Sequence, residues 1–272
     1  MADLTNWKCY AITTADRPER GRRLEAELER LGLAYSIHRG ERPPEPMGFE
    51  NAATRGCFES HLLGLRQARE EGVEVAVLVE DDVVAVRRFP ERLNVLVDEL
   101  VDVDWGMIYL GYLGGQSPVA HDTVFRVAPH IAETRGWEIQ GTHLVAVSAR
   151  WFDAIIEDFE RRLEPGGHRI PPDGVLNEFR RDHGRSALLA LPNLGRQGPS
   201  PSSITPKVGV RQRLLRRPAV GAIAWWAKRW WWDLQAVAPP SWWVRAWNVR
   251  AFRYRSSRPS RLTSEIAAGS SR

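Results

Sequence analysis

The chain has 272 residues, of which 43% are hydrophobic and 26% are charged, a composition typical of a folded globular protein that excludes a disordered chain and a polytopic membrane protein. Its two cysteines, Cys9 and Cys57, exclude a disulfide framework, and their spacing gives no zinc-site pattern. The formal net charge of +4 conceals a basic segment at residues 208–261, which holds twelve Lys/Arg residues and one acid, so the remainder is acidic.

Strand and helix patterns alternate along most of the chain. In chain order they predict a strand at 7–14, a helix at 18–31, a strand at 35–38, a helix at 54–71, strands at 73–79 and 106–110 with a helix at 89–100 between them, strands at 124–128 and 139–147, and helices at 149–163 and 174–183. Such alternation favours a layered α/β domain with a largely parallel, Rossmann-like sheet, in which the strand at 139–147 is a candidate for antiparallel pairing. The Pro/Ser-rich stretch before residue 206 marks the end of this domain, so we expect a catalytic domain at 1–206 and a tail at 207–272.

Three carboxylates, Glu80, Asp81 and Asp82, directly follow the apolar strand at 73–79. In open α/β sheets ligands bind beyond the carboxyl ends of the strands, so the cluster stands where a site is expected. Hard cations such as Mn²⁺ and Mg²⁺ prefer oxygen ligands, and residues i and i+2 of an extended segment point the same way. Glu80 and Asp82 are therefore candidate ligands of one ion. The alternative is that the trio forms a solvated turn.

Seven short motifs occur in a fixed order along the first two hundred residues. They are YAITTADRPER (10–20), RGCFESHLLGL (55–65), VLVEDDV (77–83), WGMIYLG (105–111), GTHLVAVS (141–148), IPPDGVL (170–176) and QGPSPSSI (197–204). Together they resemble glycosyltransferase family 25, which includes lipopolysaccharide glycosyltransferases and collagen galactosyltransferases. Two positions depart from the family pattern: ITTADRPER replaces the usual Asn-Leu pair before the arginine, and Pro172 stands where valine is commoner.

The resemblance implies a GT-A-type nucleotide-sugar-binding fold and transfer with inversion at the anomeric carbon, commonly from a UDP-sugar with Mn²⁺. It also implies that Glu80 and Asp82 form the metal and diphosphate motif, with Asp81 beside them. Ser202 and Ser203 match the closing serines of the family. Asp173 matches the Pro-x-Asp position.

An inverting transfer needs a base for the acceptor hydroxyl, and Asp173 is our candidate for this catalytic role. A helix N-cap is the competing interpretation of the same residue, because Asp before GVLNEF also suits a cap. Asp173 is thus either a catalytic residue or a structural one, and the sequence leaves both open.

Further donor-binding candidates surround the end of the first strand. Thr13 is placed to hydrogen-bond a nucleotide, and Arg17 and Arg20 open the next helix, where cations meet phosphates. The alternatives are a backbone-bonded threonine and a solvated helix start. His61 shares a helical stripe with Cys57, so it points into the domain, either as a core residue or toward the site. His183 is an outside candidate for a third metal ligand.

The tail has a different character from the rest of the chain. Eight of the twelve tryptophans lie between residues 225 and 247 among arginines, and the longest uncharged run has ten residues, too few to span a bilayer. Tryptophan favours the membrane interface and arginine favours anionic headgroups, which predicts an in-plane helical segment on a membrane surface. Base stacking on single-stranded nucleic acid and packing against a partner subunit are the alternatives, and nucleic acid is the less favoured.

The sequence thus predicts a metal-dependent hexosyltransferase that moves a sugar from a nucleotide-sugar donor to a glycan or lipid-linked acceptor in cell-surface polysaccharide or lipopolysaccharide synthesis. Because no secretory signal pattern opens the chain, we expect a cytoplasmic protein peripheral to the inner face of the cell membrane. Two alternatives remain: another metal-dependent nucleotidyltransferase, and a non-catalytic membrane- or nucleic-acid-binding protein on a transferase-like scaffold.

Overall fold

The computed structural model describes residues 4–113, 124–134 and 138–198. The strands are β1 (Trp7–Thr14), β2 (Ala34–Gly40), β3 (Val75–Glu80), β4 (Val83–Ala85), β5 (Met107–Leu113), β6 (Val124–Ala128), β7 (Ile131–Thr134), β8 (Gln140–Ser148), β9 (Ala187–Ala190) and β10 (Gly195–Gln197). The helices are α1 (Pro18–Leu31), α2 (Ala52–Glu71), α3 (Phe89–Leu100), the 3₁₀ turn η2 (Ala149–Trp151), α4 (Phe152–Leu163) and α5 (Pro172–Asp182). The predicted tail lies outside the described residues, as do Ser202 and Ser203.

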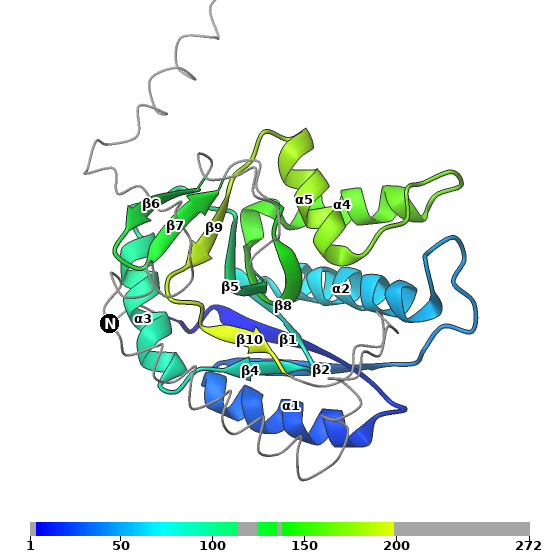
Figure 1. Cartoon of the computed structure of the whole chain (residues 1–272), viewed down its shortest axis with the longest axis horizontal. Helices are drawn as coiled ribbons and strands as arrows, with labels where there is room; N and C mark the ends of the chain where they lie inside the picture. The colour runs from blue at the N-terminus through cyan, green and yellow to red at the C-terminus, as the bar shows by residue number, and fades with distance from the viewer. Residues whose placement is uncertain (1–3, 114–123, 135–137, 199–272) are drawn as a thin grey trace, which may run out of the picture.

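The strands form one mixed sheet in the order β2-β1-β3-β8-β5-β9-β7-β6, with β10 joining β4 to β5 (Figure 1). The α/β class is confirmed, and the antiparallel pairing expected for residues 139–147 is present, because β8 runs antiparallel to both β3 and β5. The expectation of a largely parallel sheet was wrong. Parallel pairing needs a crossover connection, usually a helix, and the described residues between β5 and β8 form only strands.

Helices cover both faces of the sheet and divide the core in two. Leucines of α1 and α3 pack with Cys9 and Val77 on one face, whereas α2, α4 and α5 pack with Tyr10 and Leu78 on the other (Figure 1). The two faces follow from the alternation of side chains along β1 and β3. Gly64 lets α2 approach the sheet closely, because a Cβ there would lie 3.2 Å from Leu78 and 3.3 Å from Tyr10.

Local signals set the ends of the first two long helices. Pro18 occupies the first turn of α1, and Gly32, in the left-handed region at φ 67°, ends it. The α2 helix begins at Ala52, two residues before the predicted start, because the Asn51 side chain accepts a hydrogen bond from the Thr54 backbone N–H. None of the helices in the described segments has both the length and the apolar character needed to cross a bilayer.

The carboxyl ends of β1 and β3 meet at one edge of the sheet, since the two strands are parallel and Ile12 is in register with Glu80. After β3 the chain turns at Asp81 and Asp82 and continues as β4, which pairs antiparallel with β10. The Gly198 backbone N–H donates to the Asp82 carbonyl at 2.6 Å and fixes the turn. The predicted acidic cluster therefore occupies a defined turn between two paired strands.

Candidate functional site

The three carboxylates after β3 do not share one environment. Glu80 is the last residue of β3 and lies on the face of the sheet that α2 covers, whereas Asp81 and Asp82 contact a side chain of α1. The expectation that residues i and i+2 point the same way assumes an extended segment, and the turn at residues 81–82 ends that extension. The carboxylates are close enough that the charge of Asp82 raises the pKa of Glu80.

Glu80 is held by polar contacts from two other elements. Its Oε1 accepts a 2.6 Å hydrogen bond from the Thr142 hydroxyl of β8, and lies 3.6 Å from His61 Nε2 of α2. Burial, followed by the charge of Asp82, raises the pKa of Glu80 to about 8, against the lowering effect of the Thr142 hydrogen bond. Without a cation, Glu80 is thus an unusually weak acid at neutral pH.

Asp81 and Asp82 surround the guanidinium of Arg20. Arg20 Nη2 lies 2.7 Å from Asp81 Oδ1 and 3.4 Å from Asp82 Oδ2. Thr13 donates to Asp81 at 2.9 Å, and Gln197 of β10 donates to Asp82 at 2.8 Å. Burial raises the pKa of both aspartates, and the charge of Arg20 opposes that rise.

The candidates Thr13, Arg20, Asp81 and Asp82 are therefore brought together. Arg17 lies nearby at the start of α1, where its backbone N–H donates to the Thr14 carbonyl at 3.2 Å and its charge lowers the pKa of Asp81. Arg17 is only partly buried. It remains within electrostatic reach of the cluster.

His61 is fully buried, in agreement with its predicted inward orientation. Its Nδ1 lies 2.8 Å from the Cys57 carbonyl oxygen and 3.7 Å from the Cys57 sulfur, one helical turn earlier. Burial lowers the pKa of His61, which keeps the imidazole neutral. The ring therefore faces Glu80 without a charge of its own.

Asp173 lies in the first turn of α5, which begins at Pro172 and not at residue 174 as predicted. Its carboxylate accepts hydrogen bonds from the backbone N–H groups of Gly174 at 2.9 Å and Gly141 at 3.3 Å. The N-cap position belongs to Pro171, so Asp173 is inside the helix and also ties α5 to the start of β8. Its negative charge contributes to the raised pKa of Glu80, so the two carboxyl groups lie within electrostatic reach.

His183 was named as an outside metal ligand. It follows α5 and stacks on Phe179, with ring centroids 4.6 Å apart. It is exposed, and the described contacts place it with Phe179 and not with the carboxylates.

Sequence reasoning did not single out two residues that contact the carboxylates. Thr142 and Gln197 each belong to one of the seven motifs, GTHLVAVS and QGPSPSSI, and each donates a hydrogen bond to an acid of the cluster. A polar side chain at the start of an apolar motif was the available signal for Thr142. Gln197 had none, because its role depends on the pairing of β10 with β4.

An oxygen-rich cation site fits these residues. Asp82 Oδ1 is buried and has no hydrogen-bond partner among the described residues, and three carboxyl groups with raised pKa values lie together. Carboxylate oxygens are the ligands that Mn²⁺ and Mg²⁺ prefer, and a cation relieves the repulsion that raises these pKa values. The donor set and its unsatisfied oxygen therefore suit a hard divalent cation held by Glu80 and Asp82.

Two cavities stand out in the described part of the chain. One, of about 430 Å³, borders the carboxyl end of β2 and is lined by polar residues that include His38, Glu41, Glu59 and Ser60. Because Thr14 is in register with Gly40, this cavity is one strand away from the end of β1.

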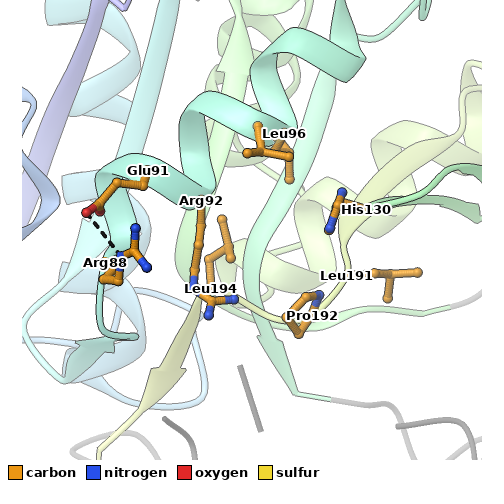
Figure 2. A pocket seen from close by; sticks show the side chains of 9 residues that line it. Arg88, Glu91, Arg92, Leu96, His130, Leu191, Pro192 and Leu194 are labelled. Carbon is orange, nitrogen blue, oxygen red and sulfur yellow. Dashed lines mark hydrogen bonds and ion pairs between the residues drawn. The ribbon is translucent and has the colours of Figure 1, made fainter. Parts of the chain in front are cut away.

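The other cavity, of about 220 Å³, lies between α3 and the segment before β10 (Figure 2). Arg88, Arg92, His130 and Pro192 are among its lining residues, and Arg88 pairs with Glu91 at 3.3 Å. β4 and β10 separate it from the carboxylates, which lie at the opposite end of the two strands.

No family model and no curated protein sequence matches the chain. Among solved structures it is similar to a glycosyltransferase involved in glycosylation of the major capsid of PBCV-1, with 15% identity over 67% of this chain and 80% of the other and a TM-score of 0.43. It is also similar to a mannose-1-phosphate geranyltransferase from Thermus thermophilus (12%, 68% and 73%, 0.40) and to an inositol-1-phosphate CTP transferase from T. maritima (14%, 71% and 71%, 0.37). All three are transferases, but likeness at this level assigns neither a family nor an activity.

Proposed function

We propose that the protein is a cation-dependent glycosyltransferase that uses a nucleotide-sugar donor, with UDP-sugars as the first donors to test. The observation that carries the proposal is the convergence of Glu80, Asp81 and Asp82 with Arg20 at the carboxyl ends of β1 and β3. A ligand with a diphosphate group matches such a site when a divalent cation is present. The family 25 motifs support this proposal, because four of the seven contribute residues to the site: Thr13, His61, Glu80 and Thr142 among them.

In this proposal Glu80 and Asp82 hold Mn²⁺ or Mg²⁺. When bound, the cation neutralises the diphosphate and stabilises it as a leaving group. Arg20 is a positioning residue, since its guanidinium fixes Asp81 and Asp82 relative to each other. Arg17, with a partly exposed side chain, is the cation available to the donor phosphates.

Asp173 is the proposed catalytic base. The two backbone N–H groups that it accepts from orient its carboxylate, and β8, from which one of them comes, also carries Thr142 beside Glu80. In the transfer, the acceptor hydroxyl oxygen bonds to the anomeric carbon, its proton passes to Asp173, and the nucleoside diphosphate leaves with the electrons of the broken C–O bond. Attack from the side opposite the leaving group inverts the anomeric centre.

The polar cavity at the end of β2 is the proposed place for the nucleoside. Its volume of about 430 Å³ falls in the usual range of small-molecule sites. Glu41 and Glu59 offer acceptors for ribose hydroxyl groups, and burial lowers the pKa of His38, which keeps that ring neutral. A nucleoside there would direct its diphosphate toward the end of β1 and the carboxylates.

The acceptor is proposed to be a glycan or lipid-linked sugar at the cytoplasmic side of the cell membrane. The support is the sequence of the tail, 207–272, in which arginines and tryptophans alternate in the manner of an interfacial segment. The domain boundary at 206 and the membrane-facing role both belong to this proposal.

The first test is calorimetric titration of the full chain with nucleoside diphosphates, with and without Mn²⁺. We expect one nucleotide to bind only with the cation, and Asp82→Asn to lose this binding. Asp153→Asn is the matched control, because Asp153 is exposed on α4 and pairs only with Arg69 among the contacts of the described residues. Equal binding by both variants, or binding that ignores the cation, would contradict the proposal.

Product analysis separates the two transferase classes. Incubation with nucleotide sugars and a sugar acceptor should release a nucleoside diphosphate and extend the acceptor. Formation of a nucleotide sugar from a sugar phosphate and a nucleoside triphosphate, with release of pyrophosphate, would instead identify a nucleotidyltransferase. Absence of any nucleotide binding would favour a non-catalytic scaffold.

A further inference from the structure

We propose that Cys57, His61 and Glu80 form a binding site for a thiophilic divalent cation such as Zn²⁺, on the α2 side of the carboxylate cluster. One ligand atom from each residue lies within 4.8 Å of the other two. The site shares Glu80 with the proposed donor site, but its other two ligands differ in kind. It stands whether or not the protein transfers sugars.

The ligand positions follow from secondary structure. Cys57 and His61 are four residues apart on α2, so their side chains share one face of the helix. The Cys57 sulfur lies 3.7 Å from His61 Nδ1, and Glu80 reaches the same point from the end of β3. Zinc bonds of about 2.0–2.3 Å in a tetrahedron place ligand atoms roughly 3.3–3.8 Å apart, so the three groups need to close by about 1 Å.

The state of His61 is an independent indication of a ligand. The imidazole is fully buried, and its Nδ1 lies 2.8 Å from the Cys57 carbonyl, an acceptor that assigns the proton to Nδ1. Nε2 then carries a lone pair, has no hydrogen-bond partner among the described residues, and lies 3.6 Å from Glu80 Oε1. Metal-bound histidines commonly donate their other N–H to a backbone carbonyl, which is the arrangement found here.

Sulfur in the ligand set determines which cations suit the site. Thiolate and imidazole select Zn²⁺ or Co²⁺ over Mg²⁺ and Mn²⁺, which prefer oxygen. Binding converts the Cys57 thiol to a metal-bound thiolate and releases its proton to solvent. Three protein ligands leave a fourth position for water, and the side chain of Glu80 is 20% exposed, which gives a path from solvent.

The test is titration of the full chain with Co²⁺, followed by absorbance. A cobalt–thiolate bond gives an intense charge-transfer band that cobalt bound only by oxygen and nitrogen lacks. We expect this band to saturate at one Co²⁺ per chain and to disappear on addition of Zn²⁺. Since the chain has only two cysteines, the band can come only from Cys57 or Cys9.

Cys57→Ser should abolish the band, and Cys9→Ala, which removes a buried thiol on the other face of the sheet, should retain it. Glu80→Gln should keep the band but weaken Co²⁺ affinity by tenfold or more, and circular dichroism checks that each variant is folded. No band in the wild type, or a band that survives Cys57→Ser, would overturn the proposal. These results are independent of nucleotide binding, so failure of the donor-site proposal is distinguishable from failure of this one.

Discussion

Replacing Arg20 with methionine tests whether the acidic cluster depends on one buried cation. The side chains of Arg20 and Asp81 are each 11% exposed and that of Asp82 is 6% exposed, so the substitution leaves two buried carboxylates without their counter-charge. Removing one partner of a buried ion pair costs about 3–5 kcal/mol of unfolding free energy. For a domain of this size that corresponds to a fall in melting temperature of about 2–4 °C per kcal/mol.

The loss should depend on pH. Burial already raises the pKa of Asp81 and Asp82 in the folded chain, and Arg20 opposes the rise, so its removal raises both pKa values further. A carboxyl with a higher pKa when folded binds its proton more tightly in that state, so stability falls as pH rises between the unfolded and folded values. The deficit of Arg20→Met should therefore be small below about pH 4, near the unfolded pKa of Asp, and should grow toward neutral pH.

Urea unfolding followed by circular dichroism between pH 5 and 7.5 measures this effect. Arg66→Met is the matched control: Arg66 pairs with Glu160 at 2.6 Å, but the two side chains are 42% and 45% exposed, so it should cost no more than about 1 kcal/mol at any pH. A saturating concentration of Mn²⁺ should recover part of the loss in Arg20→Met. Equal losses in the two variants, or a deficit independent of pH, would refute the reasoning.

Three further predictions follow from single contacts and from the tail. Thr142→Val removes the hydroxyl that favours ionised Glu80, so the rise of Mn²⁺ affinity with pH, centred near 8 in the wild type, should move upward by about one pH unit in calorimetry. Gly106→Ala should lower thermal stability by about 1–3 kcal/mol, because its Cβ would lie 1.9 Å from an indole carbon, whereas Gly21→Ala, with no atom within 4 Å, should raise it by about 0.5–1 kcal/mol. Deleting residues 207–272 should abolish flotation with anionic liposomes and leave nucleotide binding intact; persistent flotation would exclude the tail as the membrane contact.

Much of the first half of the fold could be predicted, because its signals are local. The strand Trp7–Thr14 and the helix Pro18–Leu31 have the predicted bounds, since an apolar run, a proline and a terminal glycine mark them within the sequence itself. Four short strands were missed: β4, β7, β9 and β10. Each has three or four residues and exists through its partner, as β4 pairs with β10 from more than a hundred residues away. No local window contains such information.

The same distinction applies to the site. The presence of acids after an apolar strand could be predicted, because strand length and composition indicate where β3 ends. Which side each acid faces could not, because the turn at Asp81 and Asp82 is set by the β4–β10 pair and by the Gly198 N–H. The separation of Glu80 from Asp81 and Asp82 is a tertiary property, even though the three residues are adjacent in sequence.

This separation gives Glu80 a distinct position in the cluster. Asp81 and Asp82 share the positive charge of Arg20, whereas the described contacts of Glu80 are a neutral hydroxyl and a neutral imidazole. A cation that enters the site therefore gains most by engaging Glu80, whose charge is the least compensated. The second ligand then decides the kind of ion: Asp82 on one side offers oxygen, and Cys57 with His61 on the other offers sulfur and nitrogen. It follows that Zn²⁺ and Mn²⁺ compete for Glu80, and that Cys57→Ser should relieve inhibition by Zn²⁺ without altering the response to Mn²⁺.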